Sequence, residues 1–402
     1  MTNASHFAIK FIERIVNLSE PYDEVRIIFD QYLGGSLKEV TRVKRVSSIT
    51  SVHFHVNDHT EIKNIKCLLS HIRTKSELTT YLSKKVLAHF KNHSKRVIVT
   101  HQAFIESNQP LSDLVTLPGM AERRHNLEEG DQLVLLNAVD VQCKDASITL
   151  DIFSVDTDVY ILLIGNFTRI PKSTTLIRKM SERIRIEEDY LKLGPQRAEA
   201  LIGWYAFRGT DNTGAFFGKG VTQHFQLFLR CDNDILSAFS AFGTDLDVGS
   251  SVYEQMERYV SKLYIPSGHR PTLSSSVAEV RWMLFSQKNR DCKNLPPTLG
   301  TLKPHVMRAY YMALIWKRSI VPIATMPIPL KYGWTKFHGE LKPVMYVQSP
   351  APDVLLELKS CNCKTGCKSR LCSCIKSGMV CSELCGCGDI CQNAPSEEPL
   401  EV

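Results

Sequence analysis

The sequence predicts an α/β fold that ends in a small cysteine-rich module. Three short apolar segments, at 25–30, 96–100 and 147–153, have the length and composition of strands. Helical patterns separate these segments, and strands that alternate with helices are typical of a parallel sheet flanked by helices. Nine of the thirteen cysteines lie in the last tenth of the chain, where a short, loop-rich segment cannot build an apolar core.

The size and composition of the chain exclude some classes of protein. Its 402 residues leave room for two or three domains. The hydrophobic content of 43% is that of an ordinary folded protein, and a net charge of +7 permits nucleic-acid contact without requiring it. No apolar run approaches the roughly 20 residues of a membrane-spanning helix. The first residues lack the pattern of a secretory signal, so we expect an intracellular protein with no membrane partner.

The predicted helices and strands follow from the periodicity of apolar residues and from the residues that end each segment. Apolar side chains between residues 5 and 19 recur at mostly helical spacing, which predicts an amphipathic helix. The first and third predicted strands run directly into carboxylates. In chain order, the sequence predicts a helix at 5–19, a strand at 25–30, mostly helix at 60–92, a strand at 96–100, a helix at 129–141, a strand at 147–153, and helices at 195–208, 251–263, 276–287 and 305–317.

Changes in pattern divide the chain into four segments. Residues 1–240 hold the α/β pattern, and residues 241–320 form a helical extension. Prolines become frequent beyond Pro322, so we interpret 321–360 as a connector. Residues 361–393 form the cysteine-rich module.

Acidic residues cluster where the predicted strands and helices end or begin. In an α/β sheet, sites form outside the carboxyl ends of the strands. Carboxylates can converge there only if a cation neutralises them, and their hard oxygen atoms favour Mg²⁺ or Mn²⁺. Taken singly, each acid can equally be a helix cap or turn residue. The candidates are Asp30, Glu129, Asp131, Asp156, Asp158 and Asp211.

The order of these acids resembles that of the flap endonuclease superfamily of PIN-like nucleases. An aspartate after the first strand, an E-x-D pair, a D-T-D pair and a G-x-D aspartate are followed by a glycine–lysine–glycine turn, within Asp211 to Gly220. The resemblance implies a PIN-like, flap-endonuclease-like domain. It also implies that the six acids are catalytic, holding two Mg²⁺ or Mn²⁺ ions that cleave nucleic-acid phosphodiesters.

Two groups of residues are candidates for nucleic-acid contact. One is a basic stretch after the first strand, and the other is the glycine–lysine–glycine turn, which in the family grips duplex backbone. Glycines let the backbone approach phosphate and lysine adds charge, while the alternative is a plain tight turn. A P-loop is excluded because glycine stands where Ser or Thr must hold magnesium. The candidates are Lys38, Arg42, Lys44, Arg45, Gly218, Lys219 and Gly220.

The sequence departs from the superfamily pattern in two respects. His101, rather than an aspartate, follows the second predicted strand. The helical gateway of flap endonucleases has no clear counterpart, so a 5′-flap substrate is not implied. Other histidines, such as His53, His55 and His59, lack an H-x3-H spacing on a helix, and we interpret them as surface or strand residues.

The cysteines of the last segment have the spacing C-x-C-x3-C-x4-C-x-C-x6-C-x3-C-x-C-x3-C. Three tetrahedral zinc ions that share three bridging thiolates need nine ligands, which matches this set. The alternatives are an iron–sulfur cluster and disulfides, but an odd number of cysteines leaves one thiol over. The predicted ligands are Cys361, Cys363, Cys367, Cys372, Cys374, Cys381, Cys385, Cys387 and Cys391.

This segment resembles the CXC domain of the tesmin/TSO1 family. The likeness is carried by Cys361 to Cys367, by Cys372 to Cys374, by Gly378, and by Cys385 to Asn393. It implies three bound zinc ions and a nuclear location. The DNA-binding members place a tyrosine before the fourth cysteine, where this chain has Leu371. The module carries few net charges, so it would be a weak phosphate clamp by itself.

The combination of both patterns looks like a family of mobile-element-derived animal proteins. The likeness lies in the blocks at 27–32, 154–159, 215–220 and 332–334. Two functions follow as expectations. One is a metal-dependent nuclease whose partner is nucleic acid, with DNA favoured. The other is a catalytically inactive scaffold that binds nucleic acid or protein.

Overall fold

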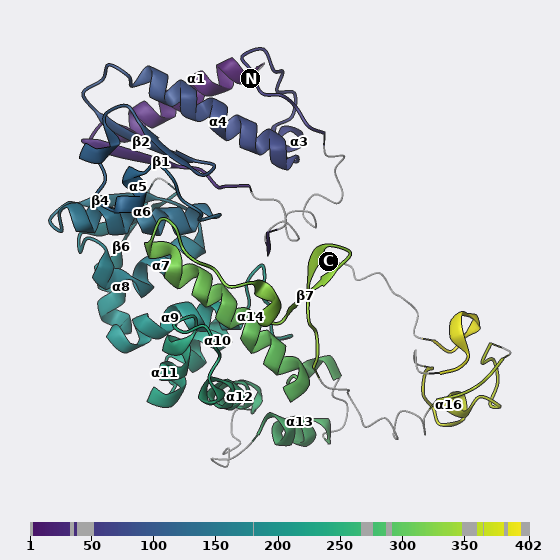
Figure 1. Ribbon diagram of the computed structural model, residues 1–402. Helices are drawn as coiled ribbons and strands as arrows, with labels where there is room; N and C mark the ends of the chain where they lie inside the picture. Colours follow the sequence, from purple (N-terminus) through teal and green to yellow (C-terminus); the bar gives the residue numbers. More distant parts are fainter. Residues whose placement is uncertain are drawn as a thin grey trace. The chain divides into compact units, whose positions relative to one another are not determined.

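The computed structural model describes residues 3–32, 36–37, 52–179, 181–266, 276–286, 292–347, 360–364, 366–381 and 385–394. The chain divides into two compact units, the first ending at Met345 and the second beginning at Tyr346 (Figure 1). The first part of the larger unit contains α1 (Ala4–Ser19), β1 (Glu24–Ile28), α3 (Ile65–Leu68), α4 (Ile72–His89), β2 (Arg96–His101), β3 (Phe104–Ser107), α5 (Pro118–Ala121) and α6 (Gly130–Lys144). The predicted first helix and first two strands are therefore confirmed within one or two residues.

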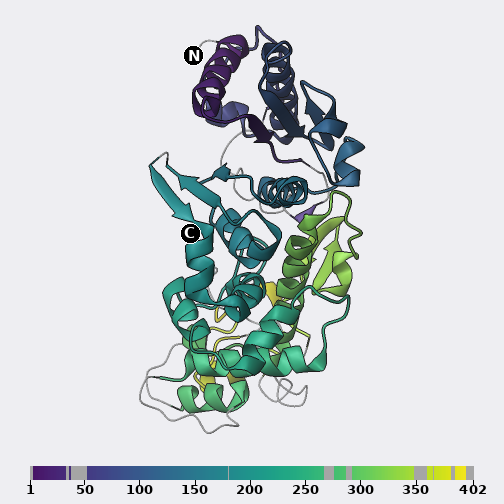
Figure 2. The same cartoon turned by 90° about the vertical axis from the view of Figure 1, so that its left-hand side faces the viewer.

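The first sheet has the order β1-β2-β3, in which β1 and β2 are parallel and β3 is antiparallel. Successive side chains of a strand point to opposite faces. Val97 and Val99 of β2 therefore face a core built with α1 and α4, while Ile98 faces a second core that includes Leu133 and Leu136 of α6. Helices thus cover both faces of this sheet, with α1 and α4 on one side and α6 on the other (Figure 2).

The rest of the larger unit is mostly helical. It contains β4 (Leu150–Phe153), α7 (Thr157–Gly165), β5 (Thr174–Arg178), β6 (Glu182–Arg185), α8 (Ile186–Leu193), α9 (Pro195–Arg208), α10 (Val221–Phe228), α11 (Asn233–Ala241), α12 (Ser250–Tyr264), α13 (Val277–Phe285), α14 (Leu299–Lys317), β7 (Trp334–Phe337) and β8 (Glu340–Pro343). Helix α9 has the predicted bounds. Helix α14 begins at Leu299 rather than at the predicted residue 305, and Pro304 lies inside it.

The second sheet has the order β4-β5-β6. Strands β4 and β5 are parallel and β6 is antiparallel. The fold is therefore mixed α/β with small sheets, and the prediction of one wholly parallel sheet needs correction. Each parallel pair carries an antiparallel edge strand that the sequence analysis missed. Strand β6 reads Glu-Arg-Ile-Arg and is largely exposed, so no apolar run marks it.

One continuous core joins α9, α11, α12 and α14. The hairpin β7–β8 packs on α14, where the Arg308 side chain donates hydrogen bonds to the carbonyl oxygens of Gly333 at 3.3 Å and Val344 at 2.5 Å. The Trp334 side chain is buried. The segment assigned to a connector at 321–360 is thus, as far as Met345, part of the larger unit.

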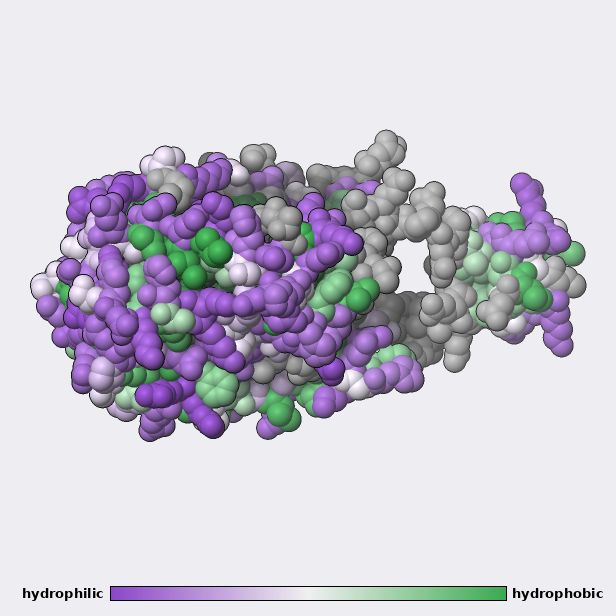
Figure 3. All heavy atoms as spheres, turned by 90° about the horizontal axis from the view of Figure 1, so that it is seen from above, coloured by the Kyte–Doolittle hydropathy of each residue, from purple (hydrophilic) through white to green (hydrophobic). Residues whose placement is uncertain are grey.

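The surface of the larger unit is mainly polar where Figure 3 displays it. Viewed from the end that carries α1 and α4, hydrophilic residues predominate and the hydrophobic ones form separate patches (Figure 3). Within the described ranges, no helix combines the length and apolar character needed to cross a bilayer.

Candidate functional site

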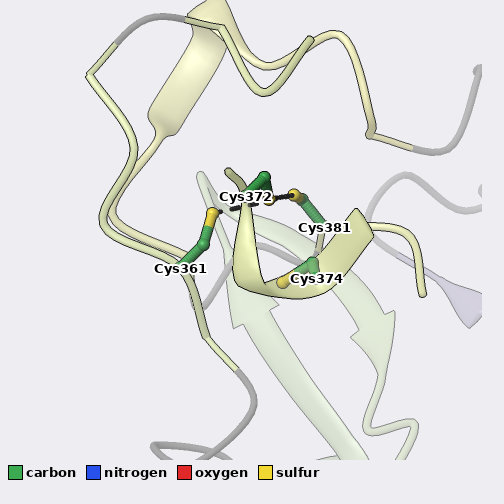
Figure 4. A group of neighbouring side chains, drawn as sticks. All are labelled: Cys361, Cys372, Cys374 and Cys381. Atoms are coloured by element: carbon green, nitrogen blue, oxygen red, sulfur yellow. Dashed lines mark hydrogen bonds between the residues drawn. The ribbon is translucent and has the colours of Figure 1, made fainter. Parts of the chain in front are cut away.

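The smaller unit gathers its nine cysteines in one cluster, in which seven are buried and Cys363 and Cys391 are partly exposed. The Sγ atom of Cys361 lies 3.6 Å from that of Cys367 and 3.8 Å from that of Cys381, and Cys372 Sγ also lies 3.8 Å from Cys381 Sγ (Figure 4). Four sulfurs held about 2.3 Å from a tetrahedral metal would be about 3.8 Å apart, whereas a disulfide is about 2.05 Å long. The separations therefore fit thiolates around metal ions and do not fit disulfides.

Short backbone contacts position these sulfurs. Cys372 caps the one-turn helix α16 (Ser373–Lys376), which carries Cys374. The amide of Cys381 donates to the carbonyl of Asn393 at 2.8 Å, and the Asn393 side chain donates to Cys381 Sγ at 3.3 Å. The amide of Gly386 donates to the Cys361 carbonyl at 2.7 Å, so distant loops of the segment meet at the cluster.

The protein environment favours thiolate at one position and opposes it at another. The backbone amide of Ile375 donates to the Cys372 sulfur, and this contact lowers the pKa of the Cys372 thiol to about 6. Burial raises the pKa of the Cys374 thiol, and the neighbouring Cys385 raises it further. Nine thiolates, seven of them buried, would need positive charge among them, which metal ions could supply.

The outer surface of the cysteine cluster is basic in part. Lys364, Lys368, Arg370 and Lys376 are exposed. Leu371 stands among them with a relative exposure of 94%, although leucine is apolar. The position before the fourth cysteine is therefore available for contact with another molecule, but it presents no hydrogen-bonding group.

In the larger unit, three of the predicted acids lie around the beginning of α6. Asp30 lies two residues after Ile28, the last residue of β1, and its Oδ1 accepts a hydrogen bond of 2.7 Å from the amide of Gly130. Glu129 is the N-cap of α6 and forms a capping box with Gln132. Asp131 lies in the first turn, and both Glu129 and Asp131 are buried. Asp30 therefore contacts the segment that carries the E-x-D pair.

The D-T-D pair lies at the beginning of α7, after β4. Asp156 is the N-cap of α7 and accepts from the amide of Asp158 at 2.9 Å. Asp158 Oδ1 accepts from the Tyr205 hydroxyl of α9 at 2.7 Å. Burial, and then this hydrogen bond, raise the pKa of Tyr205, so the hydroxyl stays protonated and orients Asp158. The guanidinium of Arg208 lies over the Tyr205 ring, 4.1 Å from its centroid.

Asp211 and the glycine–lysine–glycine turn follow α9. The turn closes with a hydrogen bond of 3.0 Å from the Lys219 amide to the Phe216 carbonyl, and Gly218 has a φ of +68°, as a type II turn requires. Gly220 is the N-cap of α10. The Lys219 ammonium lies 4.6 Å from the centre of the Tyr264 ring, so its charge is directed partly to the protein itself.

The six acids do not form a close metal-ligand group. Among the described residues, the groups of three or more whose ligand atoms lie within 4.8 Å of one another contain cysteines, or His53, His55 and Glu77, but none of the six acids. His101, at the end of β2, is hydrogen-bonded to Glu106 of β3 at 2.7 Å. The basic residues Lys38, Arg42, Lys44 and Arg45 lie outside the described residues.

The group of His53, His55 and Glu77 is the one that the sequence analysis missed. These histidines lack the i, i+4 spacing of helical metal ligands. The available signal was His53-Phe-His55, in which an extended backbone places alternate side chains on one side. Glu77 comes from α4, so the third member could not be read from local spacing.

Comparison with known proteins identifies no family for this chain. No protein-family model matches the chain, and no curated protein matches it.

Proposed function

We propose that the larger unit is a nuclease-like domain that uses Mg²⁺ or Mn²⁺ to hydrolyse nucleic-acid phosphodiesters. The observation that carries this proposal is the meeting of Asp30, at the carboxyl end of β1, with Glu129 and Asp131 at the beginning of α6. The Gly130 amide, between Glu129 and Asp131 in the sequence, holds the Asp30 carboxylate at the first turn of α6, where Glu129 and Asp131 are buried. Buried carboxylates cost stability unless hydrogen bonds or cations compensate for them.

The donor set suits a hard cation that retains water. Mg²⁺ is usually held by one or two carboxylates and keeps several water ligands, so it tolerates acids that are not in direct contact with one another. Bound divalent ions would activate a water molecule and neutralise charge on the phosphate. The chain itself orients two of the carboxylates, because the Gly130 amide donates a hydrogen bond to Asp30 and the Tyr205 hydroxyl donates one to Asp158.

The test is cleavage of branched and single-stranded DNA and RNA in Mg²⁺ or Mn²⁺ by Asp156→Asn. Asparagine is as good a helix N-cap as aspartate, so α7 should keep its cap while the carboxylate charge is lost. We expect cleavage to fall at least about a hundredfold, the scale of losing one major source of transition-state stabilisation. Asp234→Asn, an exposed acid in the first turn of α11, is the charge-matched control. Cleavage by Asp156→Asn at the wild-type rate would reject the assignment.

We also infer that the smaller unit binds three zinc ions. What supports the number is that the nine sulfurs can be divided into three sets of four, each with every pair within 4.8 Å. Cys361, Cys367 and Cys381 then belong to two sets each, as bridging ligands must. The sets are Cys361, Cys363, Cys367 and Cys372; Cys361, Cys374, Cys381 and Cys385; and Cys367, Cys381, Cys387 and Cys391. Zinc analysis should find three ions bound by the smaller unit of each chain.

The second candidate is an inactive scaffold that keeps the nuclease-like fold. It is favoured by the structural tasks of the acids, since Asp156 caps α7 and Asp30 bonds the first turn of α6. It is also favoured by His101, which is paired with Glu106 where the superfamily has an aspartate. Nucleic-acid binding without any cleavage in either metal would select this candidate.

A further inference from the structure

A cluster outside both sites has the composition of a metal centre. His53 Nε2 lies 2.8 Å from Glu77 Oε1, and His55 Nδ1 lies 3.4 Å from the same oxygen. The ligand atoms of all three side chains lie within 4.8 Å of one another. Two imidazoles and a carboxylate are the ligand set of many zinc and iron sites.

The cluster is held in place from both sides. The amide of Phe54 donates to Thr74 Oγ1 at 2.9 Å, and the amide of Val56 donates to Glu77 Oε2 at 3.0 Å. These two contacts fix the segment along α4 at alternate residues. His53 and His55 therefore project together, with ring centroids 4.6 Å apart. Because Oε2 of Glu77 is engaged by the backbone, Oε1 is the oxygen left facing the two rings.

The neighbouring groups support a ligand role for Glu77. Burial raises the pKa of Glu77, but the Val56 amide and the His53 ring outweigh this effect and keep its pKa below the usual value. The carboxylate is thus ionised at neutral pH. His71 lies beside the cluster, with its ring centroid 5.1 Å from that of His53, and its Nδ1 accepts from the Arg73 amide at the beginning of α4.

We propose that His53, His55 and Glu77 bind one divalent transition-metal ion of the zinc class, at a site independent of the cysteine cluster. Nitrogen and oxygen ligands about 2.0–2.2 Å from a tetrahedral ion lie roughly 3.3 Å apart. The His55–Glu77 separation already matches this value, and the His53–Glu77 pair opens by about half an ångström as the metal replaces its shared proton. The His55 side chain is 84% exposed, so the remaining coordination positions face solvent.

The site would join residues 53–56 to α4 through a metal ion. It differs from the cysteine cluster in its donors, which are nitrogen and oxygen rather than sulfur. It also differs from the acidic site, because imidazole favours zinc, cobalt or nickel over Mg²⁺. An ion bound there would have open positions for water or an external ligand, unlike a closed structural zinc.

The experiment is a calorimetric titration of Zn²⁺ into full-length protein whose cysteine module is already loaded with zinc. We expect one further equivalent to bind. His55→Ala should weaken this binding at least about tenfold, the lower end of what loss of even a supporting group around a metal costs. His59→Ala, which removes an exposed histidine from the same segment, is the matched control and should leave the affinity unchanged.

A second variant and a spectrum keep the test decisive. Glu77→Gln should also weaken binding, with a thermal melt in the absence of added metal to establish that the variant is folded. Co²⁺ bound at this site should produce visible d–d bands without a thiolate charge-transfer band. The proposal is overturned if no further equivalent binds below about 1 mM, if both variants bind as the control does, or if the spectrum carries the thiolate band.

Discussion

The two compact units of this chain are held together by different chemistry. The larger unit buries aromatic and aliphatic side chains, such as Phe239, Tyr259 and Trp316, in a continuous core. The buried cluster of the smaller unit, in its described residues, is made of cysteines. One unit therefore gains its stability mainly from removing apolar surface from water, whereas the other has little such surface and would depend on the metal–thiolate bonds of the proposed zinc cluster.

Because of this difference, metal ions would have different roles in the two units. Structural zinc contributes directly to the folding free energy of a small domain, because the unfolded chain has no preformed site. A cation at the acidic site or at the His53 cluster would instead add to a fold that is stable without it. Removal of metal should therefore unfold the smaller unit and leave the larger unit folded.

Chelation should have the largest effect. Removing metal with a strong chelator should unfold the smaller unit, because structural zinc supplies about 10–16 kcal/mol in small domains. Cys361→Ser should act in the same direction, since Cys361 is shared by two of the three proposed zinc sets. Cys143→Ser, an exposed cysteine of the larger unit, is the control. Protease resistance of residues 360–394 after chelation would contradict the contrast.

A core truncation should have the next largest effect, and only on the larger unit. Phe239 is fully buried against Phe207, Phe242 and Tyr259. Phe239→Ala should lower the free energy of unfolding by about 3–5 kcal/mol. The measurement is denaturant unfolding together with zinc content, which should not change. Phe285→Ala, at an exposed position on α13, should cost less than about 0.5 kcal/mol.

Mild acid should destabilise the larger unit through its buried histidines. Burial lowers the pKa of His305 to about 4, while its Nε2 lies 2.8 Å from the Phe207 carbonyl. Between pH 6.5 and 4 the unfolded state binds the proton that the folded state excludes, so stability falls as the pH falls. The loss is at most about 3 kcal/mol for one histidine. His305→Gln should reduce this dependence, which unfolding at pH 7, 6 and 5 would measure.

The response to added zinc sharpens the same comparison. Acid also weakens the smaller unit, because protons compete with zinc for thiolates. In the His55→Ala variant, which lacks a ligand of the proposed zinc site in the larger unit, excess zinc should offset that loss, but it should not restore the stability that the larger unit loses through His305. Equal protection of both units by zinc would show that their stabilities are not separate.

The sequence predicted most helices of the larger unit because apolar periodicity survives in long elements. Helix α9 was placed correctly because Gly194 and Gly209 punctuate its two ends. Strands β3 and β6 were missed because edge strands are short and need no apolar run. The hairpin β7–β8 was interpreted as part of a connector packed in part by Trp334, because the prolines around it indicate turns; Trp334 is indeed buried.

The candidate sites were predictable to different degrees. The cysteine set could be read from spacing because all its ligands lie within one short segment. The sequence analysis expected all six acids to converge, and among them the structure brings Asp30 to the beginning of α6 through the Gly130 amide. The pairing of Asp158 with Tyr205, and that of His53 with Glu77, depends on helix packing that no local pattern encodes.

The most direct measurement is the thermal unfolding of full-length protein with and without Mn²⁺, for the wild type and for Asp156→Asn. A ligand of the native state stabilises it by about 2.7 kcal/mol at a hundred times its Kd. We expect Mn²⁺ to raise the Tm of the larger unit in the wild type and to have little effect on the Asp156→Asn variant. An equal rise of Tm in both proteins, or no rise in either, would contradict a divalent-cation site that includes the Asp156 carboxylate.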